Sequence, residues 1–227
     1  RDLHSFPTRR SSDLVLKLRL STDAARERLR VLGFEDAHAA LGHIQALTNG
    51  STRAVEIQRQ LMPAMLGWFA EGPNPDYGLL AFRQLSEALG TSSWYLRALR
   101  DEGWMAQRLA RIASSSRYVV NLLMRAPEMV QMLASSENLE LRPRELLSRS
   151  MSRDIGRASD RAAAVASVRA LRRSELCRIA LADVLGAADV TTVGLALSDL
   201  AGATLDAALE LARREVEAPP KIGRAHV

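Results

Sequence analysis

The spacing of apolar residues is the feature that most limits the folds open to this chain. Between residues 53 and 69 apolar side chains recur with roughly the 3.6-residue period of an α-helix: Val55, Ile57, Leu61, Met62, Met65, Leu66 and Phe69. No stretch of five or more residues alternates strictly between apolar and polar, as a half-buried strand would. Aromatic residues make up only 4% of the chain, so the core must be aliphatic. The sequence therefore predicts an all-α fold without a sheet, a bundle-like array of about nine to ten helices.

Polar caps, glycines and prolines mark the expected helix ends. Asp36 is a candidate N-cap for residues 37–47, and Ser51 or Thr52 for a helix that runs to about residue 69. Pro63 lies inside that helix and should kink or break it. Further along, we expect helices at 127–133, 143 to about 151, 159–185, and from 189 or 191 to about 216.

The two ends are expected to be foreign to the protein. Residues 1–14 and 221–227 resemble translated sequencing-adapter DNA, so we leave them out of the fold prediction. The helical segment is then 15–220, with a first helical group at about 24–156 and a long helix pair at 157–217. Without these ends the formal net charge falls from +5 to +2, since they carry five basic and two acidic residues. The basic balance is therefore a poor argument for nucleic-acid binding, and no apolar run predicts a membrane span.

Residues that could carry chemistry are few. The chain has no dinucleotide-binding glycine pattern, no phosphate-binding loop and no metalloprotease motif. His38 and His43 are five residues apart, which places them some 140° apart around a helix and unsuited to share one metal. Cys177 has no histidine near it in the sequence, so we interpret it as a structural residue. We predict no catalytic, cofactor-binding or metal-binding residue.

The densest charge pattern lies in the expected helix at 159–185. Arg172 and Arg178 each lie three residues from Glu175, so both could pair with it along one helix face. Arg173 and Asp183 belong to the same patterned stretch. Two interpretations stay open: a solvated charged face on a packed helix, or a contact with a neighbouring domain made by Arg172, Arg173, Glu175, Arg178 and Asp183.

This stretch also carries a family resemblance. Residues 172–186 read R-R-x-E-L-x-R-I-x-x-x-D-x-x-G, and the motifs L-S-D-L-A at 197–201 and L-D-A-A-L at 205–209 follow. Upstream lie L-G-W-F at 66–69, W-Y-L at 94–96 and S-S-S-R-Y at 114–118. In order and spacing these motifs resemble the glutamine synthetase adenylyltransferase family, from about Ala24 to Val216.

The resemblance implies a large, bifunctional cytoplasmic enzyme with two homologous halves, each holding a nucleotidyltransferase site. One half attaches AMP from ATP to a tyrosine of glutamine synthetase and the other removes it by phosphorolysis, with Mg²⁺ as cofactor and the PII signal protein as a regulatory partner. This segment resembles the helical region ahead of the second catalytic core. The family's catalytic motifs would follow Val216, so no catalytic residue is carried over and the segment alone is expected to be inactive.

Two other classes of function remain as alternatives. A stand-alone helical protein-interaction module would fold and bind a partner without any catalytic core. A nucleic-acid-binding helical protein would lose affinity steeply with added salt, and the small net charge argues against it.

Overall fold

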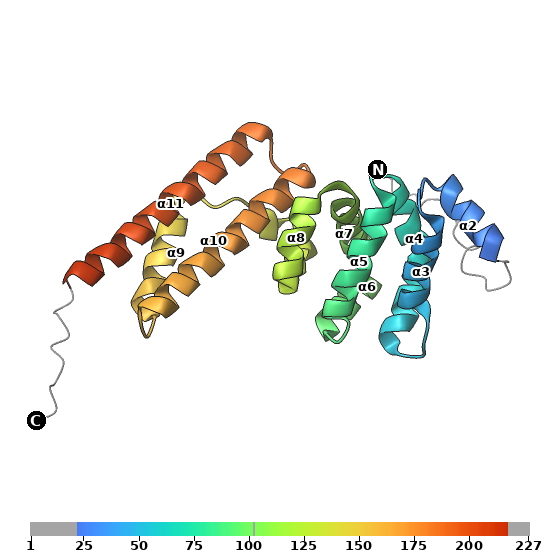
Figure 1. Cartoon of the computed structure of the whole chain (residues 1–227). Helices are drawn as coiled ribbons and strands as arrows, with labels where there is room; N and C mark the ends of the chain where they lie inside the picture. Colours follow the sequence, from blue (N-terminus) through green and yellow to red (C-terminus); the bar gives the residue numbers. More distant parts are fainter. Residues whose placement is uncertain (1–21, 102, 218–227) are drawn as a thin grey trace, which may run out of the picture. The chain divides into compact units, whose positions relative to one another are not determined.

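The structure is a computed structural model that describes residues 22–101 and 103–217, and every regular element in these ranges is a helix (Figure 1). The all-α prediction is confirmed for this part of the chain, with ten α-helices and two 3₁₀-helices against the nine to ten helices expected. The adapter-like segments 1–14 and 221–227 lie outside the described residues. The chain divides into two compact units, one ending at Leu139 and one beginning at Glu140.

Unit 1 is an array of short helices around α7. Its elements are α2 (Thr22–Val31), α3 (Ala37–Thr48), α4 (Arg53–Ala70), α5 (Pro75–Leu89), α6 (Ser93–Asp101), α7 (Gly103–Ser115), α8 (Arg117–Arg125), η1 (Pro127–Ala134) and η2 (Glu137–Leu139). Helix α7 contacts α4, α5, α6, α8 and η1. Its Met105, Leu109 and Ile112 are fully buried. Each such side chain contributes about 1.5–3 kcal/mol when removed from water, so α7 organises this core.

Local capping sets several helix starts in unit 1. The Asp36 carboxylate accepts a hydrogen bond from the Ala39 amide at 2.9 Å, and Thr52 rather than Ser51 accepts one from Val55. Ser116 caps α8 in the same way through the Val119 amide. These side chains satisfy amides that have no partner within the helix.

Of the two outcomes expected at Pro63, a kink or a break, the break does not occur. Helix α4 continues from Arg53 to Ala70 with Pro63 inside it. Proline removes one backbone hydrogen bond at this point. The neighbouring side chains of Met62, Met65 and Leu66 are almost completely buried, and this burial offsets the loss.

Unit 2 consists of three helices: α9 (Arg144–Arg157), α10 (Arg161–Val184) and α11 (Val190–Glu217), which contact one another pairwise. Helix α9 extends past the expected end at about residue 151, because Ile155 on its next turn joins the core. Unit 2 starts before α9, whereas the sequence grouped residues up to 156 with the first helices. The reason is that α9 packs on both long helices.

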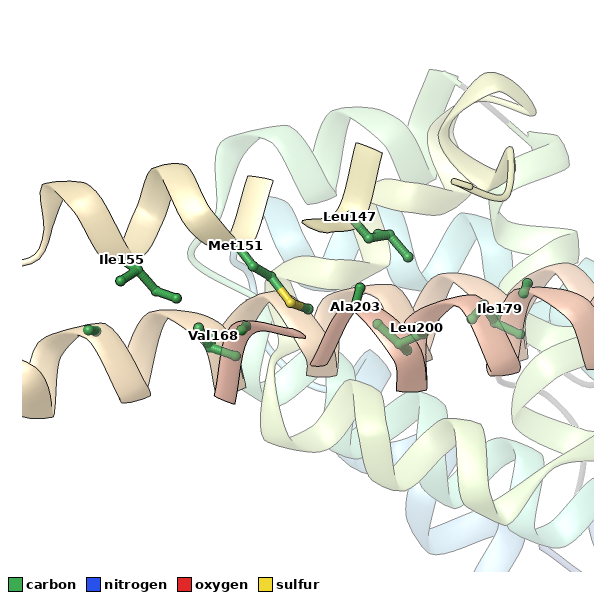
Figure 2. Close-up of a cluster of buried hydrophobic side chains, with 10 residues drawn as sticks. Leu147, Met151, Ile155, Val168, Ile179, Leu200 and Ala203 are labelled. Atoms are coloured by element: carbon green, nitrogen blue, oxygen red, sulfur yellow. The ribbon is translucent and has the colours of Figure 1, made fainter. Parts of the chain in front are cut away.

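One apolar cluster holds unit 2 together (Figure 2). Helix α9 contributes Leu147, Met151 and Ile155, which are at most 3% exposed. Facing residues come from α10 and α11: Ala164, Val168, Ile179, Ala196, Leu200, Ala203 and Ala207. The alanines let the helix axes approach closely, while the long α9 side chains fill the space between them.

Aspartates cap the two long helices. The backbone amide of Ala163 donates to Asp160 at 2.8 Å, and that of Thr192 donates to Asp189 at 2.7 Å. These hydrogen bonds lower the pKa of both carboxyl groups below the usual value for aspartate.

A close approach in unit 1 requires glycine. A Cβ at Gly78 in α5 would lie 2.8 Å from Cδ1 of Phe69 and 3.0 Å from Cβ of Ser114 in α7. Phe69 is fully buried and Ser114 is nearly so. Neither neighbour can move away without disturbing the packing around α7.

We expect Gly78→Ala to destabilise unit 1 by about 1–3 kcal/mol, the usual cost of overpacking a core. The measurement is urea unfolding followed by tryptophan fluorescence, which reports unit 1 alone because all three tryptophans lie in it. Gly67→Ala is the matched control, since a Cβ there has no neighbour within 4 Å. Equal stability of the two variants would contradict the account.

Candidate functional site

The five residues singled out by sequence lie between the middle and the C-terminal end of α10, and the structure separates them into two sets. Glu175 and Arg178 are buried, at 2% and 8% exposure. Arg172, Arg173 and Asp183 are exposed to solvent. Arg172 and Asp183 are eleven residues apart, about three helical turns, so they share a face of α10.

The buried set forms an ion-pair cluster with a third residue. Arg178 Nε donates to Glu175 Oε2 at 3.0 Å, which confirms the expected pairing three residues apart. The other carboxylate oxygen, Oε1, lies 3.1 Å from Nη1 of Arg142, in the segment before α9. That contact lacks hydrogen-bond alignment, so it acts through charge attraction.

The expected Arg172–Glu175 pair does not form among the described residues. Arg142 occupies that side of the carboxylate instead, and the Arg172 side chain is exposed. Helical spacing makes two arginines equally available to Glu175. It carries no information about a third one 33 residues upstream, which only the tertiary fold brings near.

We expect Glu175→Ala to destabilise unit 2 by about 3–5 kcal/mol, because it removes the carboxylate that pairs with the buried Arg178 guanidinium and faces Arg142. Thermal or urea unfolding followed by far-ultraviolet circular dichroism measures the effect. Arg172→Ala is the control and should stay within about 0.5 kcal/mol of the parent, as exposed substitutions usually do. A Glu175→Ala variant as stable as the control would refute the structural role of the cluster.

Cys177 lies between the two buried charged residues and is itself fully buried. Burial raises the pKa of its thiol to about 12, and the nearby Arg178 charge offsets only part of that rise. A thiol in this state is protonated at neutral pH and chemically inert. The structure therefore agrees with a structural role for Cys177.

A second group of polar contacts, which no pattern in the sequence indicated, ties α11 to its neighbours. Arg144 in α9 binds both carboxylate oxygens of Asp206 at 3.0–3.2 Å, and Ser152 donates to Glu210 at 2.7 Å. Arg161 at the start of α10 pairs with Glu215. These partners are 54 to 62 residues apart, so no local pattern reveals them.

A glycine makes room for the first of these contacts. The Arg144 guanidinium lies across α11 at Gly202, where a Cβ would come within 2.8 Å of Cζ. The bidentate contact with Asp206 and the contacts of Ser152 and Arg161 fix one orientation of α11 against α9 and α10. One side of α11 is therefore held against the other helices of unit 2.

The opposite side of α11 is apolar and exposed. Leu205 and Leu195 are 71% and 63% exposed, Leu209 is 52% and Val216 is 86% exposed. Because of this composition α11 is, among the described residues, the helix long and apolar enough to cross a membrane. Length and composition fit equally well a helix that packs against protein. Asp199 and Asp206 lie within it, and an aspartate at the centre of a bilayer costs about 2.5–3.5 kcal/mol.

Unit 1 contains a polar hollow of about 370 Å³. Asp76 accepts hydrogen bonds there from the amides of Glu35 and Asp36, and Arg117 stacks on the ring of Tyr77. His43 also lines it, with a pKa lowered first by burial and then by the Arg83 charge. Asp76 and Arg117 already have partners within the fold, so the hollow is part of how the α2–α3 loop, α3, α5 and the start of α8 join.

Histidine, cysteine and carboxylate side chains do not cluster in threes anywhere in residues 22–101 and 103–217. His38 contacts Arg26 through Nδ1 at 3.2 Å, away from the hollow that His43 lines. No described residue is therefore assigned to a metal ion.

The sequence was compared with protein families and with curated proteins, and both comparisons point to one family. The family model for glutamate–ammonia ligase adenylyltransferase matches residues 106–224, which covers parts of both units and reaches into the adapter-like segment at 221–227. The chain is 57% identical over 206 residues to a bifunctional glutamine synthetase adenylyltransferase/adenylyl-removing enzyme of Cutibacterium acnes. It is 48% identical over 212 residues to the protein of that name from Streptomyces coelicolor, and 42% over 203 residues to that from Mycobacterium leprae.

Each alignment covers most of this chain but only a small part of the relative. They include 91%, 87% and 88% of this chain, but only 21%, 21% and 20% of the three relatives. The chain thus spans about a fifth of the length of the curated relatives it matches.

Proposed function

Because the chain belongs to the glutamate–ammonia ligase adenylyltransferase family, we propose that it is a segment of an enzyme that attaches AMP to glutamine synthetase and removes it again. The observation that carries this proposal is the 57% identity to the Cutibacterium acnes enzyme over nearly the whole chain. The parent enzyme would be a cytoplasmic nucleotidyltransferase that uses ATP and Mg²⁺. In such chemistry Mg²⁺ stabilises negative charge on the transferred group.

Within that enzyme the segment serves as a helical scaffold between the catalytic cores. Unit 2 has the properties that a scaffold needs, since an apolar cluster and the contacts of Arg144, Ser152 and Arg161 with α11 hold its three helices in one arrangement. The described residues supply no cluster suited to hold Mg²⁺. We assign binding of ATP, glutamine synthetase and the PII protein to the parent enzyme and to no residue named here.

The five residues on α10 have two different tasks in this proposal. Glu175 and Arg178 hold α10 in place from within, together with Arg142. Arg172, Arg173 and Asp183 are free to meet a neighbouring domain, because their side chains point to solvent. Charged groups at the rim of an interface set its orientation and specificity more than its strength.

The first test compares the isolated chain with a graft, in which residues 24–217 replace the corresponding segment of the full-length Cutibacterium acnes enzyme. The assay follows transfer of radiolabelled AMP from ATP to glutamine synthetase in the presence of Mg²⁺. We expect no transfer by the isolated chain and transfer by the graft. AMP transfer by the isolated chain, or a folded but inactive graft, would refute the proposal; the first would show a complete active site and the second an unrelated function such as a stand-alone interaction module.

A second test addresses the exposed charges of α10. In the graft, Arg172→Glu combined with Arg173→Glu should lower AMP transfer about fivefold or more, since opposed like charges at an interface cost roughly 1 kcal/mol or more. The same pair of substitutions should leave the unfolding of the isolated chain unchanged. Arg153→Glu, at an exposed position of α9, is the control. Activity equal to that of the control would mean that these arginines belong to a solvated charged face and make no contact with a neighbouring domain.

A further inference from the structure

The exposed side of α11 carries a regular pattern. Apolar or small residues recur there at alternating spacings of three and four, and we call this set the outer seam: Leu195, Ser198, Gly202, Leu205, Leu209, Ala212 and Val216. This is the spacing of the contact positions in a pair of helices packed side by side. Every member is exposed except Gly202, which the Arg144 guanidinium partly covers.

Apart from Gly202, which the Arg144 guanidinium of α9 overlies, the outer seam is separate from the packing inside unit 2. The residues that α11 buries in the apolar cluster are Ala196, Leu200, Ala203 and Ala207, on the other side of the helix. The contacts of Asp206, Glu210 and Glu215 with α9 and α10 hold that side in place. Helix α11 cannot turn its leucines toward the apolar cluster without breaking these contacts. Only a second surface that packs on the outer seam can therefore shield it from water.

We propose that the outer seam is a docking face for an amphipathic helix from another part of the same full-length polypeptide. This inference rests on the proposed membership in a longer enzyme. The length of the relatives supports it, because about four fifths of each lies outside the region that this chain matches. A long relative of this kind has ample further chain from which such a helix can come.

The charge of α11 favours this occupant over two others. The helix has five carboxylates and two arginines, a net charge of −3. Three of the carboxylates, Asp206, Glu210 and Glu215, already contact side chains of unit 2, which leaves Asp199 and Glu217 to face a partner. Helices that lie on membranes are usually rich in Lys and Arg, so an anionic lipid surface fits poorly. A second copy would bring two net-negative helices together, whereas a helix with basic flanking residues would complement Asp199 and Glu217.

The test measures the accessibility of a single cysteine in the outer seam, introduced as Leu205→Cys. Maleimide labelling is compared between the isolated chain and the Cutibacterium acnes graft, each with the matching protein without the new cysteine as background. Native Cys177 adds little, because its thiol is fully buried. Arg149→Cys, exposed on α9, is the control position.

We expect Leu205→Cys to be labelled about tenfold more slowly in the graft than in the isolated chain, because a covered thiol is not accessible to the reagent. Arg149→Cys should change far less. Labelling of Leu205→Cys at similar rates in the two proteins would overturn the proposal. The readout does not depend on AMP transfer, so it separates failure of this docking face from failure of the proposed function.

The isolated chain distinguishes the other occupants. Light scattering at tens of micromolar should show a monomer, and vesicles of phosphatidylcholine and phosphatidylserine should leave the labelling of Leu205→Cys unchanged. A dimer that Leu205→Glu converts to a monomer would assign the outer seam to a second copy. Protection of Leu205→Cys by vesicles would assign it to a lipid surface. Either result would contradict the proposal.

Discussion

The packing of α11 on α9 is the contact on which the account of unit 2 depends. Three long side chains of α9, Leu147, Met151 and Ile155, fill the space left by the alanines and Leu200 of α11. Alanine contributes little area of its own, but it lets the helices approach until the larger side chains are buried. Once this side of α11 is committed, Leu205 and Leu209 must face outward. The exposed apolar face is thus a consequence of the inner packing.

The ion pairs of unit 2 act in two different ways. The pairs of Arg144 with Asp206 and Arg161 with Glu215 are about half exposed, so each adds little free energy but helps to fix the orientation of α11. The Glu175 carboxylate is nearly inaccessible and faces two arginines. A buried charge of this kind is costly to leave unpaired, so it ties α10 to the segment before α9 more strictly than an apolar contact would.

The sequence predicted what local rules determine. Apolar periodicity predicted the all-α fold, and side-chain caps located starts such as those at Asp36 and Thr52. It failed where tertiary packing decides. Helix α9 is longer than expected because Ile155 reaches the core.

The candidate site shows the same division. The spacing of Glu175 and Arg178 was enough to predict their pairing, whereas the partner Arg142 and the contacts of Asp206 and Glu210 join residues far apart in sequence. The exposed arginines 172 and 173 could be named from the sequence, but only the structure separates them from their buried neighbours. The family resemblance, in contrast, depends on the order of motifs along the chain and needed no structure.

We propose that α11 packs on two sides, against α9 and α10 on one and against a further helix of the full-length enzyme on the other. A structure of the full-length Cutibacterium acnes relative tests it most directly. The account predicts that the positions equivalent to Leu205 and Leu209 are buried by a helix of the same polypeptide, while the inner cluster is unchanged. Finding these positions open to solvent, or covered by a second copy of the chain, would contradict it.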